Sequence, residues 1–93
     1  MRTSRFEIPT AQAPDDPKGL YVRVTYDGFF YGPFKNEGEL VAALRTLDKV
    51  DPQWDEYGFH IHRGDPTSDD WVNKLPFVTV DDRERIEAAR RAK

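Results

Sequence analysis

Residues 20–26 alternate between apolar and polar side chains and are rich in β-formers, which predicts a β-strand. Asp27-Gly28 then predicts a two-residue hairpin turn, because both central residues of a type I′ turn need a positive φ. In that register one face of the hairpin is apolar and holds three opposed pairs: Tyr26–Phe29, Val24–Tyr31 and Val22–Pro33. The other face holds a mixed set: Tyr21, Arg23, Thr25, Phe30 and Phe34.

The pattern changes to a helical period over residues 37–50. Asn36 predicts the N-cap of this helix, and Glu39 stands at the capping-box position. One apolar stripe follows the helix: Leu40, Ala43, Leu44 and Leu47. Pro52 prevents the helix from continuing.

The last third of the chain predicts four further elements. Residues 57–63 alternate as a strand, with Phe59 and Ile61 on one side and His60 and His62 on the other. Ser68 predicts the cap of a short helical turn that ends before Pro76. The β-branched run at 77–80 predicts another strand, and Asp81, with Glu84 at the box position, predicts the cap of a C-terminal helix.

These elements together predict an α+β fold with a small, mostly antiparallel sheet. Its order is β-hairpin, helix, strand, short helical turn, strand and C-terminal helix, with the main helix packed on one face of the sheet. Residues 1–18 carry three prolines and predict a flexible N-terminal arm, although a short edge strand ending at Pro9 is an alternative. Residues 19–93 form a single α+β domain in this interpretation.

Composition narrows the class of protein. The chain of 93 residues has a formal charge of −3 and no cysteine, which excludes a disulfide framework and a thiol nucleophile. Its apolar runs are too short to span a bilayer, and its N-terminus has no apolar signal region. We therefore expect a cytoplasmic protein without membrane contact.

Candidate chemistry is sparse. His60 and His62 have the spacing of two metal ligands on one strand face, but a third ligand would have to come from elsewhere, from Asp65 or Asp55, and two histidines on a half-exposed sheet face explain the pattern better. Asp65, Thr67 and Asp69 match only the start of a calcium loop, and capping explains them better. We therefore expect no metal site, no cofactor and no enzymatic activity.

Two binding functions remain. The alternative function is nucleic-acid binding through the C-terminal helix, whose basic residues include Arg83, Arg85, Arg90 and Arg91. Acidic residues on the same helix and the acidic balance of the chain oppose it.

The main function predicted is protein–protein contact through the mixed sheet face. Its residues have the composition of an interface core: Tyr21, Arg23, Phe30, Phe34, His60 and His62. The partner is another protein, and a homodimer is one form that this contact could take. The competing interpretation is that the N-terminal arm, the turn around Trp71 or the C-terminal helix covers this face.

The segment Tyr31-Gly32-Pro33-Phe34 followed by Asn36-Glu37-Gly38-Glu39-Leu40 resembles a pattern in short, uncharacterised actinobacterial and bacteriophage proteins. The resemblance covers the end of a strand and the start of a helix. It implies a strand–turn–helix and a phage or accessory-genome origin, and it implies no activity. The sequence as a whole predicts a small, non-catalytic binding protein.

Overall fold

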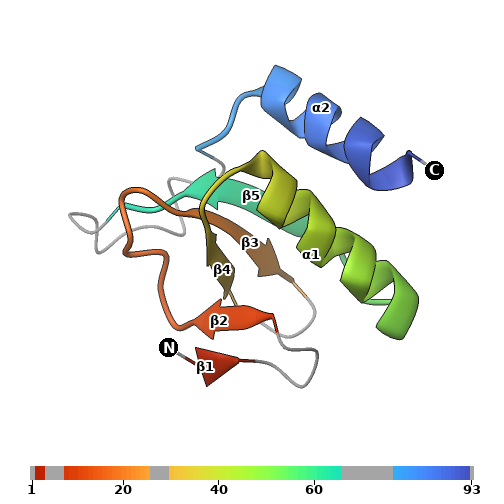
Figure 1. The fold of residues 1–93 in the computed structure, drawn as a ribbon, viewed down its shortest axis with the longest axis horizontal. Helices are drawn as coiled ribbons and strands as arrows, with labels where there is room; N and C mark the ends of the chain where they lie inside the picture. The colour runs from red at the N-terminus through yellow and green to blue at the C-terminus, as the bar shows by residue number, and fades with distance from the viewer. Residues whose placement is uncertain (1, 4–7, 26–29, 66–76, 93) are drawn as a thin grey trace.

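A computed structural model describes residues 2–3, 8–25, 30–65 and 77–92 of the chain. It is an α+β fold in which an antiparallel sheet carries the main helix on one face (Figure 1). The strands are β1 (Arg2–Thr3), β2 (Pro9–Ala11), β3 (Leu20–Val24), β4 (Phe30–Phe34) and β5 (Phe59–Arg63). The helices are α1 (Glu37–Val50) and α2 (Val80–Arg91), and the strand order is β1-β2-β4-β3-β5.

The β3–β4 hairpin is shifted from the predicted register. Val22 lies opposite Tyr31, and Arg23 lies opposite Phe30, which is a shift of two residues. Side chains alternate along a strand, so a shift of two leaves each of them on its predicted face. The predicted turn at Asp27-Gly28 lies outside the described residues.

Phe34 is the exception. It was predicted on the mixed face of the hairpin, and that prediction is wrong. The β3–β4 register shifts between Leu20 and Val22, so Phe34 lies opposite Leu20 and joins the core under α1. Gly32 lies at this irregularity with a φ of 135°, and a Cβ there would lie 2.7 Å from the Leu20 carbonyl oxygen. Glycine is therefore required at this position.

Helix α1 begins and packs as predicted. The Asn36 side chain accepts a hydrogen bond from the Glu39 backbone N–H at 2.9 Å. Leu40, Leu44 and Leu47 are buried against one face of β3 and β4. This face carries Val22, Val24 and Tyr31.

The predicted strand at 77–80 is wrong, and so is the predicted cap at Asp81. Thr79 is the N-cap of α2: its hydroxyl accepts from the Asp82 N–H, and the Asp82 carboxylate accepts from the Thr79 N–H. This reciprocal capping box satisfies two backbone donors and begins the helix at Val80. The predicted helical turn at 68–75 lies outside the described residues.

The N-terminal segment belongs to the sheet rather than to a separate arm. Thr10 lies opposite Tyr31 and Ala11 opposite Phe30, so β2 extends the sheet beyond β4. Ile8 and Pro14 are buried. Pro9 begins the strand, a position where the lack of an N–H is tolerated. A flexible arm over 1–18 was predicted, whereas residues 8–16 pack into the fold.

No helix among the described residues is both long and apolar enough to cross a membrane.

Candidate functional site

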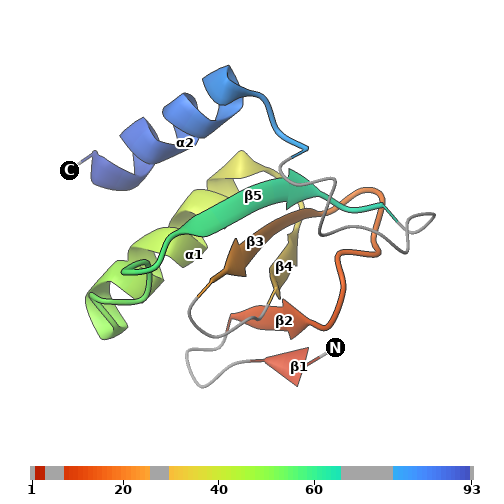
Figure 2. The same ribbon diagram turned by 180° about the vertical axis from the view of Figure 1, so that it is seen from behind.

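The predicted partner-binding face is largely covered. In Figure 2 neither α1 nor α2 crosses the side of the sheet turned toward the viewer. Even so, Tyr21, Phe30 and His62 have exposed fractions of 1% or less. The ring of Phe77 stacks on His62 with centroids 5.6 Å apart. The prediction that these three residues belong to an exposed patch is therefore wrong.

The other three residues of the predicted patch are distributed differently. Phe34 is buried on the α1 face, as described above. Arg23 and His60 lie opposite each other on β3 and β5 and are half-buried. Burial lowers the pKa of His60, and the nearby positive charges of Arg23 and Arg83 lower it further.

His62 is completely buried on the face of the sheet away from α1. Among the described residues, neither of its ring nitrogens has a hydrogen-bond partner. Burial lowers its pKa to about 4, and the charges of His60 and Arg23 act in the same direction, while the Arg63 backbone opposes them in part. Within the described residues no three potential ligand side chains gather as a metal site would require.

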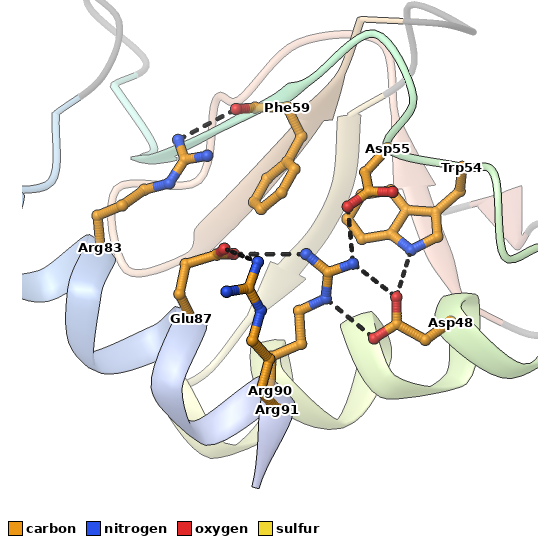
Figure 3. A network of polar contacts seen from close by, with 8 residues as sticks. All are labelled: Asp48, Trp54, Asp55, Phe59, Arg83, Glu87, Arg90 and Arg91. Atoms are coloured by element: carbon orange, nitrogen blue, oxygen red, sulfur yellow. Dashed lines mark hydrogen bonds and ion pairs between the residues drawn. The ribbon is translucent and has the colours of Figure 1, made fainter.

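Three arginines of the nucleic-acid alternative, Arg83, Arg85 and Arg90, connect α2 to other parts of the fold, and Figure 3 shows Arg83 and Arg90. Arg83 donates to the Phe59 carbonyl at 3.1 Å, and its guanidinium lies 4.4 Å from the centre of the Phe59 ring. Arg85 pairs with Glu37 of α1 and with Asp82. Each of these guanidinium groups is therefore already used within the fold.

Arg90 is the centre of the network in Figure 3. Its guanidinium donates twice to the Asp48 carboxylate, at 2.7 and 2.9 Å, and once to Asp55 at 2.7 Å. The Trp54 indole N–H donates to the same Asp48 carboxylate at 2.8 Å. These bonds lower the pKa of Asp48, with the Arg90 bonds as the largest cause. Among the residues that the structure describes, the neighbouring Arg91 forms an ion pair with Glu87, at 3.5 Å, and it is 76% exposed.

A hollow of about 570 Å³ lies between β2, β4 and the turn that follows β2. We call it the β2 groove. Its lining residues come from three segments: Thr10, Ala11, Gln12, Ala13, Asp15, Asp16, Tyr21 and Pro33. Tyr21 is thus both a member of the predicted patch and part of the wall of this groove.

Hydrogen bonds fix the turn that forms one wall of the β2 groove. The Asp16 N–H donates to the Tyr21 hydroxyl at 3.0 Å, and the Gly19 N–H donates to the Asp16 carbonyl at 3.0 Å. After β5, the Asp65 N–H donates to the Pro14 carbonyl at 2.8 Å. The wall is therefore held from both β3 and β5.

Gly64 allows this close approach, and its replacement should disturb the wall. A Cβ at residue 64 would lie 1.8 Å from the Asp16 carbonyl oxygen, so the turn would have to move. We expect Gly64→Ala to lower the free energy of unfolding by about 1–2 kcal/mol, as overpacking does. Urea unfolding measures this.

Gly38→Ala in the first turn of α1 is the matched control, because an added Cβ there would lie 3.2 Å from the Asn36 side-chain oxygen, a much smaller overlap than at Gly64. It should change stability by less than about 1 kcal/mol, since the helix propensity of alanine offsets a small shift of the Asn36 side chain. Equal effects of the two substitutions would contradict the close contact at Gly64.

The comparisons with known proteins give no family or relative: no family model matches the chain, and no curated protein or solved structure matches it either.

Proposed function

We propose that this protein is a non-catalytic binding protein that recognises another protein through the β2 groove. The observation that carries the proposal is the groove itself, an open hollow of about 570 Å³ lined by β2, the turn that follows it, and single residues of β3 and β4. A pocket for a small molecule usually encloses most of its ligand. An open hollow instead suits an anchor side chain that a partner protein inserts while the surrounding surfaces exclude water.

The rigid wall supports this proposal. A binding site that is already formed loses less conformational freedom when the partner arrives. The bonds from Asp16 to Tyr21 and from Asp65 to Pro14 hold the wall in place without a ligand. By contrast, three of the four arginines proposed for nucleic-acid contact, Arg83, Arg85 and Arg90, are engaged in the attachment of α2.

A random peptide library selected against the whole protein tests the proposal. The selected peptides should bind wild type and lose at least about tenfold in affinity for Ala11→Phe, because the new ring occupies the groove that an anchor would fill. Fluorescence anisotropy of labelled peptides measures the affinity.

Ala88→Phe is the matched control, since Ala88 is exposed on α2 and does not line the groove. Its affinity should stay within about twofold of wild type, because a contact outside the site adds little. The proposal is wrong if no peptide is enriched, or if the enriched peptides bind Ala11→Phe as well as wild type.

A further inference from the structure

Resting on the proposed function, we infer that the β2 groove receives a lysine or arginine side chain from the partner protein. The first reason is the charge at the groove. Asp15 and Asp16 both line it. The Asp16 carboxylate accepts the Lys18 backbone N–H at 2.9 Å, and no ion pair joins either carboxylate to a described basic side chain. Two carboxylates without a cationic partner favour a cation from outside.

The second reason is the apolar part of the lining. Ala11, Ala13 and Pro33 provide small apolar surfaces beside the carboxylates. Lysine and arginine combine an aliphatic stem with a charged end, and they pack the stem on apolar surface while the charge stays near water or a counter-charge. An acidic side chain would be repelled, and a purely aliphatic one would leave both carboxylates unpaired.

The third reason is Tyr21. Its side chain is completely buried yet lines the groove. Its hydroxyl accepts the Asp16 N–H at 3.0 Å. Burial raises the pKa of Tyr21, and the charges of Asp15 and Asp16 raise it further, so the hydroxyl keeps its proton. It therefore remains a neutral polar group in the wall of the groove, without a positive charge that would repel a cation.

A basic side chain complements both the acidic and the apolar parts of the lining. The carboxylates complement its charge, the alanines and the proline complement its stem, and the hollow is large enough for one such side chain. The partner is thus a protein segment that presents an exposed lysine or arginine.

Nuclear magnetic resonance titration of the whole, isotope-labelled chain tests the inference with three defined probes. These are the N-acetyl, N-methylamide derivatives of lysine, arginine and norleucine, the last having the lysine stem without its charge. The lysine and arginine probes should shift the amide signals of residues 10–16 in a saturable way. The norleucine probe should bind at least about tenfold more weakly, because it makes no charged hydrogen bond.

Two variants of equal net charge separate a specific site from a general effect of charge. Asp15→Asn with Asp16→Asn should weaken the lysine probe by about tenfold or more. Asp81→Asn with Glu84→Gln removes the same charge from exposed positions on α2 and should change affinity by less than about twofold, because distant exposed charges are screened by salt.

The inference is overturned if norleucine binds as well as lysine, if both double variants weaken the probe equally, or if residues 10–16 do not respond. Its failure is distinct from failure of the proposed function. Library peptides that bind wild type, lose affinity for Ala11→Phe and contain no basic anchor would sustain protein binding and reject a cationic side chain.

Discussion

Arg90→Met should lower the free energy of unfolding by about 2–3 kcal/mol, because it leaves carboxylates that were paired in a partly buried site without a counter-charge. The Arg90 side chain is only 9% exposed, and Asp48 and Asp55 are about one-third exposed. Methionine keeps much of the aliphatic stem, so the loss of stability is caused mainly by removal of the guanidinium group. Urea unfolding followed by circular dichroism measures it, and tryptophan fluorescence gives a second signal, to which Trp54 beside the Arg90 guanidinium contributes.

Arg91→Met is the matched control for this prediction. Arg91 is next in the same helix, is 76% exposed and, within the described part of the chain, pairs with Glu87 at 3.5 Å. Exposed pairs of this kind contribute little, so its loss should be below about 0.5 kcal/mol. If the two substitutions cost the same, Arg90 does not hold α2 on α1 and the network in Figure 3 has no special role in stability.

A double-mutant cycle measures how much of this stabilisation comes from the interaction between Arg90 and Asp48. Asp48→Asn alone and together with Arg90→Met should give a coupling free energy of about 1–2 kcal/mol, as direct contacts do. Arg90→Lys should keep only part of the stability. A lysine cannot donate the paired bonds that the guanidinium makes to Asp48 while also reaching Asp55.

The elements that could be predicted from the sequence depend on short-range signals. Helix α1 is specified by a cap at Asn36, an apolar stripe and a proline after its end, all within one segment. The two faces of the hairpin were also predictable, because alternation survives a shift of two residues. The position of Phe34 was not predictable. It depends on the irregularity at Gly32, where the backbone meets the Leu20 carbonyl of the neighbouring strand.

The start of α2 was misinterpreted because two local signals compete in residues 77–80. The β-branched residues there favour a strand, whereas Thr79 and Asp82 form a capping box. The box was present in the sequence and could have been found. Val78 is buried in the core although residues 77–80 form no strand, because a single side chain can insert into the core without one.

The β2 groove was not predictable from local pattern. Asp15 and Asp16 are neighbours in sequence, and neighbours on a strand or helix point apart. Here they lie in a turn, where both line one hollow. That turn is held by the bond from Asp65 to Pro14, a contact between segments 51 residues apart in a chain of 93 residues. Contacts of this kind depend on the assembled fold.

Acid should destabilise this protein between about pH 6.5 and pH 4 because of His62. The pKa of His62 falls from its ordinary value of 6.5 to about 4 in the folded state. Between these values the unfolded chain binds a proton that the folded protein does not, so stability falls as pH falls. The stability contribution is complete above pH 6.5, and its loss levels off below pH 4, where the folded state is protonated as well.

The expected loss between pH 7.5 and pH 5 is about 2 kcal/mol, since each unit of pKa difference corresponds to about 1.4 kcal/mol. Urea unfolding at the two pH values measures it. His62→Phe, which keeps a ring beside Phe30 and Phe77, should remove most of this difference. His60 lies on the same face but is only half-buried, so His60→Gln should remove much less of this difference.

The comparison between pH values separates protonation from packing. A phenylalanine that fits the site imperfectly would lower stability at both pH values alike, and the difference between them would still disappear. Glu37, Asp48 and Asp82 have pKa values below those of ordinary carboxyl groups, so their ion pairs are lost mainly below this window. An unchanged pH difference in His62→Phe would show that His62 is not the group whose protonation opposes folding.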